Sequence, residues 1–334
     1  MRKIISMVLI LVSMTWCQEN WVKRNSGSWA YLHCATYGSG MIMVVGDSGT
    51  ILTSSDGINW NKKKEAPRSY LYSVTYGCNQ FVIATLEGAI LATTNGNLIR
   101  ETYRSATNKF SSAAYGNNLF VVVGYGGQIF TSSDLITWKA KGMYADRIKF
   151  VNYCGDRFMT CWPVMSSLNP DLIGRWESII TGVGTNPLSV CYGNNRFVIV
   201  YDDGEIASSA DTKKWIVKSV GRPGEYNTIT YGNNQFVAIL RDTVYTSIDG
   251  YNWNKTNTAV PGTFSVNFCN NKFVAVGYNG AIFTSEASTK VVEPRRSIAL
   301  NNTTINVRIR INGRTLPAGS RGVYISNHVK KIAF

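Results

Sequence analysis

The feature that most constrains this chain is a repeat of 37 to 39 residues that recurs seven times. Each repeat carries an aromatic marker, and the markers are Tyr37, Tyr76, Tyr115, Tyr153, Tyr192, Tyr231 and Phe268. A second series follows 22 or 23 residues behind the first six markers: Trp60, Ile99, Trp138, Trp176, Trp215 and Trp253. A period of this length indicates stacked copies of one supersecondary unit, because a single unit cannot bury its apolar face alone.

The third repeat shows what one unit contains. Gly116-Asn117-Asn118 predicts a tight hairpin turn, because these residue types tolerate a positive φ. Phe120–Val123 is a β-branched and aromatic run that is too short for a helix, so it predicts a buried strand. Gln128–Ser132 predicts a third strand, and Trp138 opens a fourth. Four short antiparallel strands per repeat are typical of one propeller blade. The sequence therefore predicts an all-β chain that forms a seven-bladed β-propeller of four-stranded antiparallel blades.

The seventh repeat lacks a tryptophan-led fourth strand of its own. Val291 stands where that tryptophan is expected, whereas Trp21 stands one repeat length before the first tryptophan of the series. We therefore predict that residues 21–24 complete the last blade and close a ring that spans residues 18–288. The alternative is that residues 291–293 supply this strand and that Trp21 only packs on an edge.

The repeats resemble those of a known group of propellers. The two recurring patterns are Tyr-Gly-Asn-Asn-x-Phe-Val-x-Val-Gly and Thr-Ser-x-Asp-Gly-x-x-Trp, and the second is seen at Thr53–Trp60 and Thr246–Trp253. They resemble exported bacterial propellers with repeats related to the sialidase Asp-box and to photosystem II assembly-factor-like propellers. The Asp-box of sialidases has one more residue between its aspartate and its tryptophan. In those families it is a structural turn, so the resemblance implies a fold and not an enzyme.

Both ends of the chain differ from the repeats. Residues 1–17 place two basic residues before a short apolar run, which is the order of a secretory signal peptide. We therefore expect an exported protein, secreted or held at the cell surface, without a transmembrane segment in the mature chain. Whether Cys17 is lipidated stays open. Within residues 289–334, Ile305–Ile311 strictly alternates apolar and polar residues, which predicts a small C-terminal β-appendage. This tail resembles the C-terminal sorting domains of type IX secretion, and an appendage without an export role is the alternative.

Charge and cysteine content bear on the partners. Loss of Arg2 and Lys3 with the signal peptide lowers the formal net charge from +14 to +12. For an exported protein this favours anionic polymers or cell-surface groups over nucleic acid, although charges that protect edge strands explain it as well. The cysteines show no Cys-x-x-Cys spacing, so we expect no metal site and no cofactor. Cys154 and Cys191 occupy comparable places in neighbouring repeats, and both a disulfide and two buried thiols stay open. We expect a monomer.

Catalytic chemistry is scarce in the sequence. His33 precedes the first marker and His328 lies in the tail, so a nucleophilic relay inside the ring has no base available. Asp202, Asp203 and Glu205 keep glycoside hydrolysis by two carboxylates open. We assign no catalytic residue and predict a non-catalytic binding or scaffolding module for a cell-surface glycan or protein partner. The alternative is a carbohydrate-active enzyme of the glycoside hydrolase or sialidase-like class.

The turn between the second and third strands is the most variable part of the repeat. In a propeller these seven turns converge on one face beside the central channel, where aromatic and charged tips can hold a ligand. The predicted ligand-binding residues on this face are Tyr125, Trp162, Tyr201, Asp202, Arg241 and Tyr278. The fourth repeat has lost its turn glycines there, which favours a contact at this blade or marks it as degenerate. Ordinary variation of an exposed loop is the alternative.

Overall fold

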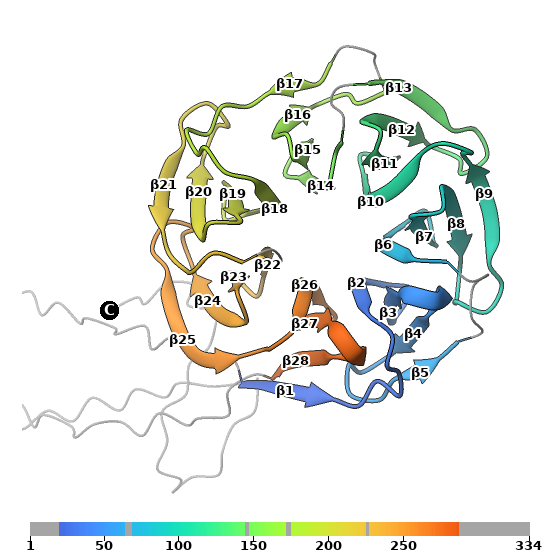
Figure 1. Cartoon of the computed structure of the whole chain (residues 1–334), viewed down its shortest axis with the longest axis horizontal. Helices are drawn as coiled ribbons and strands as arrows, with labels where there is room; N and C mark the ends of the chain where they lie inside the picture. The colour runs from blue at the N-terminus through green and yellow to red at the C-terminus, as the bar shows by residue number, and fades with distance from the viewer. Residues whose placement is uncertain (1–19, 64–68, 144–146, 172–174, 225–226, 287–334) are drawn as a thin grey trace, which may run out of the picture. The chain divides into compact units, whose positions relative to one another are not determined.

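Seven antiparallel β-sheets arranged in a ring make up the described part of the chain (Figure 1). The computed structural model describes residues 20–63, 69–143, 147–171, 175–224 and 227–286. The chain divides into two units between Ala287 and Ser288, and only the first contains described residues. The predicted signal peptide and the predicted β-appendage lie outside the described residues. The predicted all-β, seven-bladed propeller is confirmed.

Six blades are built from four consecutive strands each, running outward from the centre of the ring. Blade one is β2 (Leu32–Gly38), β3 (Met41–Gly46), β4 (Ile51–Ser54) and β5 (Asn61–Lys62). Blade two is β6 (Leu71–Gly77), β7 (Gln80–Thr85), β8 (Ala89–Thr93) and β9 (Arg100–Arg104). Blade three is β10 (Lys109–Gly116), β11 (Leu119–Tyr125), β12 (Gln128–Ser132) and β13 (Lys139–Met143). Blade four is β14 (Phe150–Cys154), β15 (Arg157–Cys161), β16 (Met165–Ser167) and β17 (Glu177–Ser178). Blade five is β18 (Pro187–Gly193), β19 (Arg196–Tyr201), β20 (Glu205–Ser209) and β21 (Ile216–Ser219). Blade six is β22 (Thr228–Gly232), β23 (Gln235–Leu240), β24 (Thr243–Ser247) and β25 (Asn254–Ala259).

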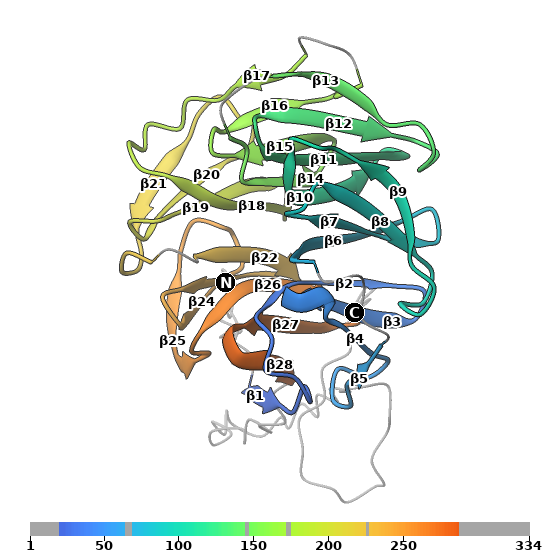
Figure 2. The same ribbon diagram turned by 45° about the vertical axis from the view of Figure 1, so that its right-hand side comes forward.

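The seventh blade joins the two ends of the ring. Its first three strands are β26 (Thr263–Cys269), β27 (Lys272–Gly277) and β28 (Ile282–Glu286), and its fourth is β1 (Asn20–Arg24). β1 runs antiparallel along the outer edge of β28, with Trp21 opposite Ser285 (Figure 2). The Trp21 ring packs on Phe273, at 6.4 Å between ring centroids. The predicted closure of the ring by the N-terminal strand is therefore confirmed.

Apolar side chains fill each junction between neighbouring blades of the described ring. The second strand of each blade is buried on both faces, so its β-branched side chains pack alternately into the two junctions beside it. In blade three, Val122 belongs to the cluster shared with blade two, whereas Val121 and Val123 belong to the cluster shared with blade four. Each blade consequently depends on both neighbours.

The hairpins between the first and second strands differ from the prediction in one respect. Asn117 and Asn118 form the turn with φ of 45° and 57°, as the turn chemistry requires. Gly116, in contrast, ends strand β10 and has no positive φ. A Cβ at Gly116 would lie 2.1 Å from Cγ of Tyr153 in the next blade. The glycine is therefore needed for packing between blades and not for the turn.

The aspartates of the outer turns have the structural role that the sequence predicts. In blade three, Asp134 Oδ1 accepts hydrogen bonds from the backbone N–H groups of Ile136 and Thr137, at 2.9 and 2.8 Å. The Ser132 hydroxyl donates to the same oxygen at 3.0 Å. Donation from Thr137 and then Ile136 lowers the pKa of Asp134 to about 2, because these bonds favour the charged carboxylate.

The six described cysteines are free thiols. Cys154 and Cys191 are both buried, and burial raises the pKa of each thiol. The disulfide left open for this pair is thus absent, and the buried-thiol alternative holds. Within the described residues, no helix is both long enough and apolar enough to span a bilayer.

Candidate ligand-binding site at the mouth of the channel

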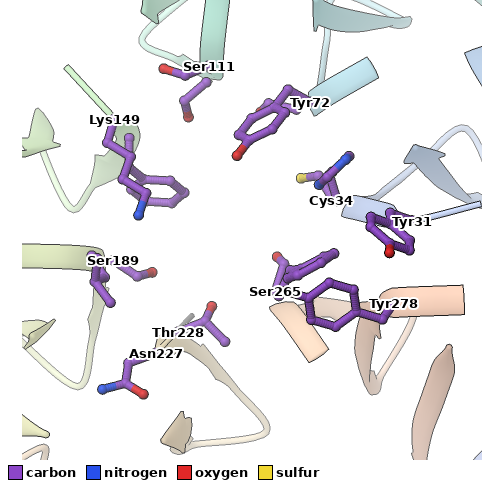
Figure 3. A pocket seen from close by; sticks show the side chains of 16 residues that line it. Tyr31, Cys34, Tyr72, Ser111, Lys149, Ser189, Asn227, Thr228, Ser265 and Tyr278 are labelled. Carbon is purple, nitrogen blue, oxygen red and sulfur yellow. The ribbon is translucent and has the colours of Figure 1, made fainter. Parts of the chain in front are cut away.

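A cavity of about 290 Å³ lies where the inner strands of all seven blades begin (Figure 3). Its wall contains one repeat position from every blade, four residues before each aromatic marker: His33, Tyr72, Ser111, Lys149, Leu188, Asn227 and Phe264. The following position also lines the cavity in every blade and is mostly a small hydroxyl residue: Cys34, Ser73, Ser112, Phe150, Ser189, Thr228 and Ser265. A repeat position that holds a different residue type in every blade therefore faces the channel.

β-bulges explain why these side chains reach the channel. The pairing of strands one and two shifts register across His33, Tyr72 and Ser111, and likewise across Leu188 and Phe264. A bulge leaves its extra residue out of the ladder and re-aims the side chain. In blades four and six the corresponding residues are Lys149 and Asn227. Each comes directly before the first residue of the inner strand that pairs with the second strand. A bulge thus supplies the lining residue in five blades, and the residue just before the paired strand supplies it in blades four and six.

Blades seven, one and two supply an aromatic wall. The His33 ring is stacked between Tyr72 and Phe264, with centroid distances of 4.6 and 5.4 Å. Phe264 in turn contacts Tyr278 edge-on at 4.2 Å, and Tyr278 contacts Tyr31 at 4.9 Å. Edge-to-face and offset contacts of this kind hold the rings in fixed orientations. The aromatic wall is therefore preformed.

Hydrogen bonds fix two members of this wall. His33 Nε2 lies 2.6 Å from Oδ1 of Asp47, which opens η1 (Asp47–Gly49) between the second and third strands of blade one. The second member is Tyr72, which is hydrogen-bonded to the Tyr125 side chain. Burial, and to a lesser degree the contact with Tyr125, raise the pKa of Tyr72 to about 12. Tyr72 therefore stays a neutral phenol at physiological pH.

Blades three to six supply a mostly polar wall opposite the aromatic one, interrupted by Phe150 and Leu188 (Figure 3). Several of its hydroxyls connect neighbouring inner strands. The Ser112 hydroxyl accepts from the N–H of Val151 at 3.1 Å and donates to its carbonyl at 3.3 Å. The Thr228 hydroxyl accepts from the N–H of Val266 at 3.4 Å. These bonds hold the polar wall in place, because each one joins two blades.

A cationic corner lies beside the polar wall. The Arg147 guanidinium lies 4.7 Å from the Tyr125 ring centroid and 4.9 Å from the Trp162 ring centroid. Lys149 Nζ lies 5.5 Å from the same tryptophan ring. Cation–π contacts hold the two positive charges in place, and a guanidinium between two rings can still donate hydrogen bonds at its edge. This corner can receive an anionic or amide group.

The structure separates the six predicted ligand-binding residues into two groups. Tyr125 and Trp162 meet at Arg147, and Tyr278 lines the cavity itself. Arg241 is exposed, and lies with Leu240 and Tyr245 in a separate hollow. Their role in binding stays a prediction.

Tyr201 and Asp202 differ from the expectation of exposed tips. Tyr201 is 1% exposed, because its ring fills the junction between blades four and five and its hydroxyl bonds Thr181 Oγ1 at 2.6 Å. Asp202 accepts from the Asn186 side-chain amide at 2.7 Å and from the Asn186 N–H at 3.2 Å. The aromatic tip predicted at Tyr201 is therefore wrong, and Asp202 fixes the connection between two blades.

The residues that sequence analysis missed lie on the inner strands and on the connections between blades. His33 was set aside because it precedes the first marker, yet it stands at the centre of the aromatic wall. Arg147 and Lys149 come just before β14 in the connection from blade three. The signal was present, since the position four residues before each marker changes chemical class from one repeat to the next.

Comparisons with known proteins relate the fold to other propellers. No protein-family model matches this chain, and no curated protein matches it. Among solved structures, YCF48 bound to a D1 peptide superimposes with a TM-score of 0.66 at 15% identity, covering 81% of this chain and 98% of that one. A virginiamycin B lyase from Staphylococcus aureus gives a TM-score of 0.68 at 10% identity, covering 80% and 99%. The WD40 propeller of Doa1 gives 0.67 at 11% identity, covering 82% and 98%. At these identities the likeness is one of fold.

Proposed function

We propose that this protein is an exported, non-catalytic propeller that binds a segment of a partner protein at the mouth of its channel. The observation that carries this proposal is the ring of equivalent residues, one from each blade, around the cavity, with aromatic rings on one side and mostly hydroxyl, amide and ammonium groups on the other. One structure of the same fold is described as YCF48 bound to a D1 peptide, which supports a peptide as the kind of ligand.

The cavity size supports one inserted side chain and not a large small-molecule ligand. Its volume of about 290 Å³ lies just below the range of roughly 300–1,000 Å³ for ligand pockets. An aromatic or apolar side chain would pack against the aromatic wall, while backbone amides or an acidic neighbour would face Lys149 and Arg147. Rigid rings lose little side-chain entropy on binding, which favours them as anchors.

Selection of a peptide library on the purified full chain tests this function. We expect selected peptides to share an aromatic or apolar anchor, and Phe264→Ala to weaken a selected peptide by about tenfold or more, as at other central contacts. Arg147→Ala should weaken peptides that carry an acidic residue beside the anchor. A glycan array probed with the same protein tests the glycan partner that the sequence also predicts.

The matched control is a cation–π pair outside the channel. Lys218 Nζ lies 3.5 Å from the Tyr251 ring centroid, and Lys218 belongs to outer strand β21. Lys218→Ala removes an equivalent contact without touching the cavity. Equal effects of Lys218→Ala and Arg147→Ala, or failure to select any peptide above background, would contradict the proposed site.

Export is supported by the order of charged and apolar residues before residue 18. The secreted form should begin near Gln18 when its N-terminus is sequenced. An intact Met1 in protein recovered from the cytoplasm would contradict export.

Deletion of residues 289–334 tests the sorting tail, since surface display should then be lost while secretion across the inner membrane continues.

A further inference from the structure

The outer turn of blade four lacks a group that four other blades contain. In blades one, three, five and six, a serine at the end of the third strand donates to an aspartate two residues later. The Oγ–Oδ1 distances are 2.9, 3.0, 3.1 and 3.0 Å in the pairs Ser54–Asp56, Ser132–Asp134, Ser209–Asp211 and Ser247–Asp249. In blade four the corresponding residues are Ser167 and Asn169, so the carboxylate is missing from this turn.

Ser167 shows the consequence of this replacement. The residue is 2% exposed, and its Oγ finds no hydrogen-bond partner in the described part of the chain. A buried hydroxyl without a partner is unfavourable, because it has given up its hydrogen bonds to water. The same Ser167 lines a cavity of about 210 Å³, together with Ser166 and Asn169. Ser167 therefore borders a space from which a ligand could approach its hydroxyl.

Two arginines line the same cavity. Arg157 is held by Asp156, at 2.9 Å from Nε to Oδ1, and its guanidinium carbon lies 5.7 Å from the Phe197 ring centroid in blade five. Arg175 is exposed and approaches from the segment before β17. Glu177 is the one acidic residue among the described lining residues, and Asp156 pairs with Arg157 from outside the lining. A guanidinium presents a fork of planar donors, which favours a carboxylate as the ligand.

We propose that this cavity binds a carboxylate, which takes the place of the aspartate missing from the turn. The carboxylate accepts from the Ser167 hydroxyl, as the turn aspartates do in four other blades, and lies beside the guanidinium groups of Arg157 and Arg175. Its source is either an acidic side chain of a partner or a free small carboxylic acid. The site lies on the opposite face of the ring from the channel mouth, because the turns between third and fourth strands and those between second and third strands lie at opposite ends of the blade.

Thermal unfolding of the full chain in sodium acetate, at an ionic strength matched with sodium chloride, tests the site. Acetate should raise the unfolding midpoint in a saturable way, because a ligand that binds only the folded state stabilises it. Ser167→Ala should weaken acetate binding by roughly tenfold, as for loss of a hydrogen bond to a charged group. Glu177→Gln should tighten it by removing the like charge.

Asn169→Asp supplies the sharpest test. This variant restores the aspartate at the repeat position, so it should raise the unfolding midpoint without acetate and abolish the response to acetate. Ser132→Ala, in an intact turn, and Arg196→Ala, at the repeat position of Arg157, are matched controls that should leave the acetate response unchanged. Phe264→Ala in the channel should also leave it unchanged, which separates this site from the peptide site.

Two peptides distinguish the sources of the carboxylate. Acetyl-Gly-Asp-Gly-amide should bind and acetyl-Gly-Asn-Gly-amide should not. Binding of the acidic peptide without a response to acetate would assign the site to a partner side chain, and binding of both would mean that a free acid suffices. Identical midpoints in acetate and chloride, with neither peptide bound, would overturn the proposal, as would an Asn169→Asp variant that responds to acetate like the natural chain.

Discussion

The contact between a glycine of one blade and an aromatic ring of the next gives a quantitative test of how the ring is held together. A Cβ placed on Gly116 would lie 2.1 Å from Cγ of Tyr153. Carbon atoms in contact lie about 3.5–4.0 Å apart, so the ring would have to move by at least about 1.4 Å. Comparable distances of 2.1 or 2.2 Å recur at four other junctions, at Gly38, Gly77, Gly193 and Gly232.

Gly116→Ala should therefore destabilise the ring. Overpacking of a well-packed junction costs about 1–3 kcal/mol. The lower flexibility of alanine in the unfolded chain stabilises the folded state by about 0.4–1 kcal/mol, which opposes this loss. This gain is expected here because Gly116 has no positive φ, so alanine can adopt its backbone conformation. The expected net loss is about 1–2 kcal/mol. At about 2–4 °C per kcal/mol for a domain of 150–250 residues, the midpoint should fall by several degrees.

Equilibrium unfolding in urea of four proteins measures this effect: the natural chain, Gly116→Ala, Tyr153→Ala and the double variant. The double variant should lose less stability than the sum of the single variants, because without the ring the new methyl group meets no obstacle. Gly184→Ala is the control, since Gly184 has no positive φ and a Cβ there has nothing within 4 Å. If Gly116→Ala is as stable as Gly184→Ala, or if the single effects simply add, the packing explanation is wrong.

Two further predictions concern the closure of the ring and its response to acid. Trp21→Ala should lower the free energy of unfolding by about 2–3 kcal/mol, near the lower end for a large aromatic truncation because Trp21 is half-buried. Trp29→Ala, at a residue that is 87% exposed, should leave thermal unfolding unchanged, and equal effects of the two would contradict the closure role. Backbone N–H groups hold the pKa of Asp134 at about 2, below its unfolded value of about 3.9. The stability that Asp134 gives to the folded state is therefore complete above about pH 3.9 and is lost as the pH falls toward 2. The urea midpoint should consequently be lower at pH 2.5 than at pH 7, and Asp134→Asn should reduce the difference; a midpoint that is independent of pH would contradict this.

The regular parts of the fold could be predicted because they depend on local chemistry that repeats. Asn117 and Asn118 specify a turn through their own backbone preferences, and the valines after Phe120 specify a strand buried on both faces. Trp21 could be assigned to the last blade because its spacing matches the series although its place in the sequence is remote. These signals need no knowledge of which residues meet in space.

The remaining features depend on contacts between blades, which one repeat does not specify. Gly116 looks like a turn residue in the sequence, and only the ring of Tyr153 from the next blade shows its packing role. Tyr201 occupies a turn position but reaches back into a junction, where Thr181 satisfies its hydroxyl.

The candidate site was only half predictable for a similar reason. The face that carries the variable turns was identified, and Tyr278 does line the cavity. The bulge residues were missed because an alternating pattern does not say where a strand inserts an extra residue. His33, considered only as a possible catalytic base, proved to be an element of an aromatic stack.

The pairing of the two terminal strands also determines how the ring would respond to a pulling force. Asn20 lies opposite Glu286, so both ends of the ring leave from the same end of one five-residue strand pair. Tension between the ends would load these hydrogen bonds one after another, as in a zipper, and not all at once in shear. β1 would therefore detach first and expose the backbone N–H and C=O groups along the edge of β28. A molecule held only by its tail carries no such load across this strand pair, whereas one held at both ends would open there.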